Sequence, residues 1–136
     1  MARILISYRR EDTAAYAGRL YDHLTAHFGR DNVFMDIATI RPGQDFVEVL
    51  EQSVGACDAV VAVIGKNWLT SSESGGGRRL DEPDDFVRRE IAIALRRQIT
   101  VVPVLVGGAR MPRTEELPSD LATLSRRQAR RLLRIW

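Results

Sequence analysis

The chain has 136 residues with a hydrophobic fraction of 45% and a charged fraction of 28%, values typical of a single soluble domain with its own core. Its formal net charge of +2 gives no reason to expect nucleic acid as a partner, and its one cysteine, Cys57, excludes an internal disulfide. No apolar run approaches the roughly 18 residues that cross a bilayer, and the first residues lack a signal-peptide cleavage site, so we expect a cytoplasmic protein without a membrane partner.

Four short apolar runs, rich in β-branched residues, predict strands at residues 3–7, 32–36, 58–65 and 100–107. The third and fourth runs are nearly continuous in Val and Ile, which is typical of strands buried on both faces of a parallel sheet. Pro103 in the fourth run has no backbone N–H, so we expect an irregularity in that strand.

Between these runs, apolar side chains recur at helical spacing, which predicts helices at residues 12–28, 44–54, 84–97 and, more briefly, 115–125. Asp12 or Thr13 is placed to cap the first helix. The tail, residues 129–136, fits either a short strand or a helix. The alternation of strand and helix predicts a doubly wound α/β sandwich with right-handed crossovers, formed by one domain over residues 1–136.

Ligands of an open α/β sheet bind where the carboxyl ends of the strands lie. The turns at the opposite edge are short and plain, whereas the loops after the strands are long and rich in charged side chains. These loops carry the following candidates for a binding crevice: Arg9, Arg10, Asp36, Arg41 and Trp68.

Several common chemistries are excluded by missing motifs. No GxGxxG follows the first strand, and Gly65–Lys66 lacks the upstream glycine of a phosphate-binding loop. His23 and His27 are four residues apart on a helix but have no third ligand nearby, so we expect no metal. Cys57 has no evident base, which favours a buried structural thiol.

Glu90 lies beside the apolar stripe of the 84–97 helix, one turn after Phe86. A structural interpretation is a carboxylate favoured near the positive end of the helix, by about 0.3–1 kcal/mol. A functional interpretation is a carboxylate held at the rim of a pocket. Periodicity alone favours the structural interpretation.

Four segments resemble, in this order and at this spacing, the sequence boxes of the Toll/interleukin-receptor (TIR) domain family in its bacterial form: "ILISYRRED", "VFMDIATIRPGQDF", "DAVVAVIGKNWL" and "FVRREIAIAL". The resemblance covers nearly the whole chain. It implies a flavodoxin-like fold, a doubly wound sandwich whose five-stranded parallel sheet has helices on both faces, with the fifth strand near 129–133.

The resemblance also implies partners. Residues 36–45 correspond to the loop through which TIR domains dock on one another, so other TIR domains are expected partners in a homo-oligomer or filament. The self-association residues would be Ile40, Arg41, Pro42 and Gly43. Because TIR domains are usually joined to a sensing domain, the resemblance leaves open that these 136 residues are one part of a longer chain.

Many bacterial and plant TIR domains cleave NAD⁺ at the nicotinamide–ribose bond, with a glutamate in an aromatic-x-x-x-Glu-Ile pattern after the third strand. Here that pattern is Phe86 to Glu90-Ile91, with Phe where many relatives have Trp. The resemblance implies that Glu90 is catalytic, that NAD⁺ is a substrate, and that neither cofactor nor metal is needed. The expected substrate-binding residues are Arg9, Arg10, Asp36, Phe46, Trp68 and Phe86.

Alternatives remain for three of these residues. Trp68 could be apolar cover over the third strand, and Arg9 and Arg10 could be solvated charges or partners of Glu11 and Asp12.

Three functions are compatible with this pattern. The first is an NAD⁺ nucleosidase, a hydrolase or cyclase activated by TIR self-assembly in bacterial defence or signalling. The second is a non-catalytic TIR interaction module. The third, a receiver domain phosphorylated on Asp36 or Asp58, is disfavoured because the third strand ends in Gly65 and no lysine follows the fourth.

Overall fold

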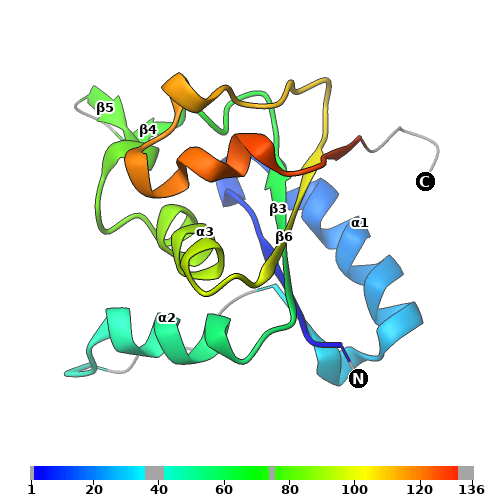
Figure 1. Cartoon of the computed structure of the whole chain (residues 1–136). Helices are drawn as coiled ribbons and strands as arrows, with labels where there is room; N and C mark the ends of the chain where they lie inside the picture. The colour runs from blue at the N-terminus through cyan, green and yellow to red at the C-terminus, as the bar shows by residue number, and fades with distance from the viewer. Residues whose placement is uncertain (1, 36–41, 74–75, 132–136) are drawn as a thin grey trace.

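Five parallel strands form the central sheet of the computed structural model, in which residues 2–35, 42–73 and 76–131 are described (Figure 1). The strands lie in the order β2-β1-β3-β6-β7, and every neighbouring pair is parallel. Their bounds are Ile4–Ser7 for β1, Val33–Phe34 for β2, Ala59–Ile64 for β3, Thr100–Leu105 for β6 and Arg130–Arg131 for β7. The β1–β3 pair therefore lies inside the sheet, with β2 on one side and β6 and β7 on the other, as in a flavodoxin-like fold. The expected fold and its fifth strand are confirmed.

Successive residues of the central strands enter two separate cores. Ile4, Ile6 and Val61 pack on the side covered by α1 (Arg10–Phe28). Leu5 and Val60 pack on the other side, which is covered by α2 (Phe46–Gly55), α3 (Phe86–Arg96) and the 3₁₀ helix η4 (Ser119–Arg126). Figure 1 shows α1 on one side of the sheet and α2 and α3 on the other. Since both faces are covered, β3 is apolar at every position.

The helices differ from expectation at two places. The helix α1 begins at Arg10, before the predicted capping residues Asp12 and Thr13. It kinks at Thr13, whose φ is −132°. The N-cap of α1 is Arg9, without a side-chain capping hydrogen bond, so the capping prediction is wrong. The Thr13 hydroxyl instead donates to the carbonyl of Arg9 at 3.3 Å. The predicted 115–125 helix is two 3₁₀ segments, η3 (Thr114–Glu116) and η4. None of the described helices is long and apolar enough to span a membrane.

Two further details concern strands. The expected irregularity at Pro103 is wrong, because β6 pairs with β3 in continuous register through Ala62 and Pro103. The Ser/Gly-rich connection after β3 contains an unpredicted antiparallel hairpin, β4 (Ser72–Glu73) and β5 (Gly76–Arg78). Short 3₁₀ turns complete the described elements, η1 (Arg30–Asn32) and η2 (Arg79–Asp81).

The end of β3 touches the start of α1 at Gly65. A Cβ atom on Gly65 would lie 2.5 Å from Thr13 Cγ2 and 2.6 Å from Asp12 Oδ2. Burial at this junction raises the pKa of the Asp12 carboxyl, although a hydrogen bond from the Asn67 backbone and the charge of Arg9 act in the opposite direction. The absence of a side chain at residue 65 therefore allows α1 to approach the carboxyl edge of the sheet closely.

We predict that Gly65→Ala lowers the free energy of unfolding by about 1–3 kcal/mol, because the added methyl group overpacks the junction. Gly18→Ala is the matched control: a Cβ there meets no atom within 4 Å, and Gly18 lies inside α1. This control should raise stability by about 0.5–1 kcal/mol, the usual helix preference for Ala over Gly. Urea denaturation measures both. A Gly65→Ala variant as stable as wild type would contradict the close approach.

Candidate active site

Glu90 occupies the second turn of α3 and turns toward the carboxyl end of β1. Its Oε1 accepts a hydrogen bond of 2.9 Å from the hydroxyl of Ser7, the last residue of β1. Only 8% of Glu90 and 1% of Ser7 is exposed. The structural interpretation of Glu90 as a charge favoured by the helix end is weakened, because that effect fades beyond the first turn and this carboxylate is buried. Burial at the carboxyl edge of the sheet fits the functional interpretation.

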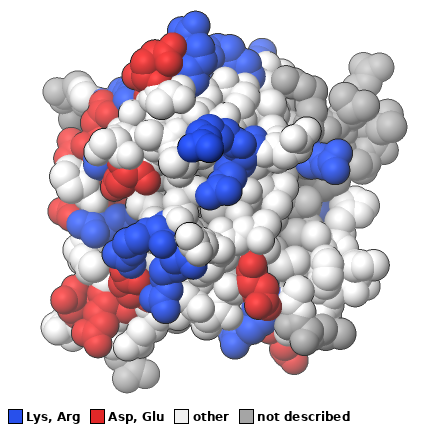
Figure 2. Space-filling view, in the orientation of Figure 1, with Lys and Arg blue, Asp and Glu red and all other residues white. Residues whose placement is uncertain are grey.

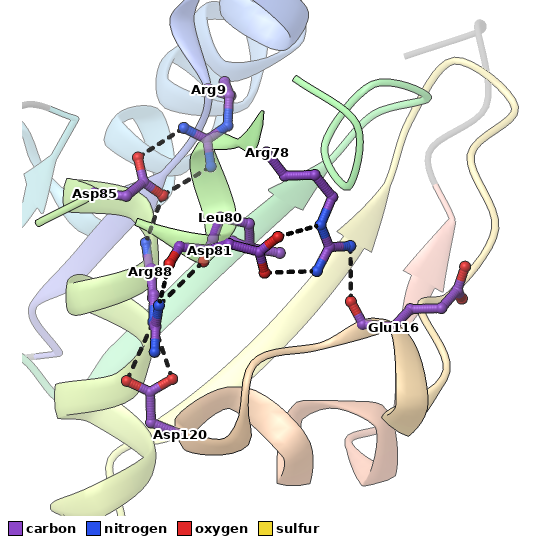
Figure 3. Close-up of polar contacts among 8 residues, drawn as sticks. All are labelled: Arg9, Arg78, Leu80, Asp81, Asp85, Arg88, Glu116 and Asp120. Atoms are coloured by element: carbon purple, nitrogen blue, oxygen red, sulfur yellow. Dashed lines mark hydrogen bonds and ion pairs between the residues drawn. The ribbon is translucent and has the colours of Figure 1, made fainter. Parts of the chain in front are cut away.

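A buried ion pair joins Arg9, the N-cap of α1 just after β1, to the start of α3. Arg9 donates to Asp85 from both terminal nitrogens, at 2.8 and 2.9 Å, and the side chains are 1% and 3% exposed (Figure 3). Asp85 is also the N-cap of α3 and accepts from the Arg88 backbone N–H at 3.2 Å. A bidentate arginine–carboxylate pair fixes both distance and orientation. The end of β1 and the start of α1 therefore hold α3 at two points, Glu90 and Asp85.

Two residues expected to touch substrate are buried. Trp68 is fully buried in the apolar core on the side of the sheet that α3 covers, and the Arg9 guanidinium is occupied by Asp85. The burial of Trp68 agrees with the alternative in which this side chain is apolar cover over the third strand. Arg9 pairs with an acid, as its alternative proposed, but the partner is Asp85 and not Glu11 or Asp12. In this arrangement neither side chain is available to a ligand, and the geometry favours a supporting role for both.

The expected aromatic residues lie together at the rim. Phe86 and Phe46 begin α3 and α2, and their ring centroids are 5.8 Å apart. Phe86 is 51% exposed, and Glu90 follows it by one helical turn. The Arg89 guanidinium lies 5.2 Å from the centroid of the Phe46 ring. An exposed aromatic face thus stands next to the buried carboxylate, where it can stack on a planar ligand.

The remaining predicted residues are exposed or outside the described ranges. Arg10 is exposed at the start of α1, and Pro42 and Gly43 are exposed before α2. Gly43 has a φ of +86°, a backbone conformation that favours glycine. The residues outside the described ranges are Asp36, Ile40 and Arg41. The roles assigned to all six stay predictions.

Arginines fix the connection that leads into α3. Arg88 donates to the Asp120 carboxylate at 3.1 Å and to the Asp81 carbonyl at 3.0 Å (Figure 3). Arg78 donates to the Asp81 carboxylate at 2.9 Å and to the Glu116 carbonyl at 2.8 Å. The segment between β3 and α3 is therefore tied to η3 and η4 before it reaches Asp85.

Surface charges of both signs are intermixed on the face shown in Figure 2. Glu116 illustrates the pairing: hydrogen bonds from Arg110, and then from the Arg113 backbone, lower the pKa of its carboxyl to about 2.

A groove of about 520 Å³ lies between α2, α3 and η4, lined in part by Val47, Ala92 and Asp120. Its lining does not include Glu90, but it does include Arg89, the residue whose guanidinium lies over the Phe46 ring.

Cys57 and the metal-ligating residue types are the other reactive groups to locate among the described residues. Cys57 is free and buried, as expected for a structural thiol, and burial is the main cause that raises its pKa. Among the residues that the structure describes, no cluster of three or more His, Cys, Asp or Glu side chains could hold a metal ion.

Sequence reasoning missed Ser7 and Asp85 as members of the site. Asp85 stands directly before α3, which is a typical N-cap position, but nothing in the sequence indicates its pairing with a residue 76 positions away. For Ser7, the sequence offers one signal, its position at the end of the first predicted strand.

We predict that Arg9→Met and Asp85→Asn each lower stability by about 3–5 kcal/mol, because each leaves an unpaired buried group. Asn at residue 85 can still accept the capping hydrogen bond. The double variant should be less destabilised than the sum of the single variants, which a urea-denaturation cycle detects. The exposed pair Arg113–Glu115 is the control and should be worth no more than about 1 kcal/mol. Equal effects at the two pairs would contradict the clamp.

Comparisons with known proteins identify the family and agree with the fold described above. A family model described as "TIR domain" matches residues 4–133. No curated protein sequence matches the chain. Solved structures do match, among them "Structure of the activated Roq1 resistosome directly recognizing the pathogen effector XopQ (TIR domains)", with 18% identity and a TM-score of 0.58 over 93% of this chain and 70% of that chain. At this identity the structural match shows the fold alone. Because the family model spans nearly the whole chain, the protein belongs to the TIR domain family.

Proposed function

We propose that this TIR domain cleaves NAD⁺ at the nicotinamide–ribose bond, as a hydrolase or a cyclase, with Glu90 as the catalytic carboxylate. The observation that carries the proposal is a buried glutamate fixed at the carboxyl edge of the sheet, one turn from the exposed ring of Phe86. Many TIR domains with a glutamate in this pattern have this activity. The proposed setting is cytoplasmic bacterial defence or signalling, with a sensor domain elsewhere in a longer chain.

The chemistry explains why one carboxylate is enough. The bond between ribose C1′ and the nicotinamide nitrogen breaks, and its electron pair neutralises the positive charge of the leaving group. No general acid is therefore needed, whereas ordinary glycosidases use a pair of carboxyl groups. The ribose becomes an oxocarbenium-like cation, which a fixed carboxylate in a site of low polarity stabilises. In hydrolysis, water then adds to C1′ and loses a proton.

Other side chains contribute binding in this proposal. The exposed face of Phe86, with Phe46 behind it, offers a stacking surface for nicotinamide or adenine. Arg10 is exposed at the start of α1 and supplies a positive charge for the diphosphate. Arg9 supports the site indirectly through Asp85.

We predict that Glu90→Gln and Glu90→Ala reduce NAD⁺ cleavage at least about 100-fold, because the transition-state cation loses its counter-charge. Gln keeps the size of the side chain and can still accept from Ser7, so this variant isolates the charge. Glu48→Gln, on the exposed side of α2, is the control. Chromatography of reaction products measures cleavage, and thermal unfolding checks the fold. Turnover near wild type in Glu90→Gln would reject Glu90 as the catalyst.

Assembly is the second part of the proposal. The similar structure named above is a resistosome containing TIR domains, which supports association of TIR domains as a working arrangement. A neighbouring copy would shield the exposed rim around Phe86 from water and orient the ribose, and positioning can contribute about 7–11 kcal/mol to lowering a barrier. The exposed turn at Pro42–Gly43 is the proposed contact.

The main alternative is a TIR interaction module without catalysis. The exposed turn at Pro42–Gly43 supports this alternative as well, and NAD⁺ consumption by concentrated protein separates the two functions.

A receiver function has less support. Asp58 accepts from the Arg3 backbone N–H at 2.8 Å just before β3 begins, which places it at the amino edge of the sheet.

We predict that the initial rate per molecule rises with enzyme concentration over a hundredfold range, because the complete site forms between copies. Gly43→Val should suppress this rise: its φ of +86° strains a β-branched residue in an exposed turn. Gly77→Val is matched, since Gly77 has a φ of +55° and no atom within 4 Å of a Cβ. The control should keep the rise. Full activity in dilute monomer would contradict the composite site while leaving Glu90 as the candidate catalyst.

A further inference from the structure

The hydroxyl of Ser7 is held rigidly at the point where it meets Glu90. Ser7 pairs with Ala62 of β3 in parallel register, and β1 lies between β2 and β3 in the sheet. With 1% of the residue exposed, the side chain is enclosed by protein. Groups carried on strands are placed more precisely than groups on loops. The 2.9 Å hydrogen bond from Ser7 to Oε1 therefore fixes the position of the Glu90 carboxylate relative to the sheet.

Glu90 needs such a partner for a physical reason. A glutamate side chain has several rotatable bonds, and a buried carboxylate is costly unless it accepts hydrogen bonds. A donor fixed on the sheet restricts the plane of the carboxylate before any substrate arrives. Stabilisation of a developing cation depends on this preorganisation, since a group already oriented does not have to reorganise during the reaction.

We propose that Ser7 is a positioning residue: its hydroxyl fixes the orientation in which the Glu90 carboxylate faces the reacting ribose. This inference rests on the proposed NAD⁺ cleavage. Ser7 acts through Glu90 and forms no bond with substrate, so its loss lowers kcat and leaves KM nearly unchanged. A serine that bound the ribose directly would instead raise KM.

Three substitutions at residue 7 separate the hydroxyl from packing. Ser7→Ala removes the hydroxyl without adding volume. Ser7→Thr and Ser7→Val add the same methyl group, and only Thr keeps the donor, so the difference between them reports the hydrogen bond alone. We expect Ala and Val to lower kcat by about 10- to 100-fold with KM within about threefold of wild type, and Thr to keep most of the activity. Rates are compared at one high enzyme concentration.

The control is Thr25→Val. Thr25 lies near the end of α1, where its hydroxyl donates to the Asp22 carbonyl at 3.1 Å. This variant loses a hydroxyl remote from Glu90 and should leave both kcat and KM unchanged.

A second measurement does not depend on turnover. Carbon-13 labelling of glutamate carboxyl groups gives a Glu90 resonance that is assigned by its loss in Glu90→Gln. We expect Ser7→Ala and Ser7→Val to move this resonance, and Ser7→Thr and Thr25→Val to leave it near its wild-type position.

The outcomes distinguish this inference from the proposed function. If wild type cleaves NAD⁺ and Glu90→Gln does not, an unchanged kcat in Ser7→Ala overturns the positioning role alone. Equal losses in Thr and Val with an unmoved resonance would assign Ser7 to packing, and a raised KM with normal kcat would assign it to substrate binding. If wild type does not consume NAD⁺, the catalytic role of Ser7 falls with the proposed function, even where the resonance moves.

Discussion

Two carboxylates of α3 are buried at the carboxyl edge of the sheet, and each requires a partner there. Water is nearly excluded from Asp85 and Glu90, so an unpaired negative charge at either position would be strongly unfavourable. The end of β1 supplies the Ser7 hydroxyl for Glu90, and the start of α1 supplies the Arg9 guanidinium for Asp85. The angle and depth at which α3 lies on the sheet are therefore set by polar contacts at its start and by apolar packing along the rest of its length.

The surroundings of α3 follow from the same constraint. Arg9 is also the N-cap of α1, and α1 starts close to the end of β3, where Gly65 leaves room for it. Arg88 and Arg78 hold the incoming connection against η3 and η4, so Asp85 arrives at a defined place. The aromatic rim of Phe46 and Phe86 then lies where two helices begin. Each of these contacts places another part of the candidate site.

Much of the architecture could be predicted from local sequence pattern. β3 is apolar at successive positions because both of its faces are covered, and that pattern alone predicts a parallel sheet between helices. Glu90 could be singled out because a helical wheel places it beside the core. The Arg9–Asp85 pair could not, since its members are 76 positions apart and many arginines and acids compete for such pairs. The β4–β5 hairpin could not either, because its Ser/Gly-rich sequence lacks the alternation that predicts strands.

The contacts that orient Glu90 also determine when the site can exist during folding. Ser7 and Glu90 are 83 positions apart, and β3, which lies between them in sequence, pairs with β1 in the sheet. Contacts of such long range carry a loop-closure cost that is repaid only when most of the sheet is assembled. A chain still emerging from the ribosome, or one that is partly unfolded, therefore lacks an oriented carboxylate. For a protein proposed to consume a central metabolite, this coupling confines the chemistry to molecules that have completed folding.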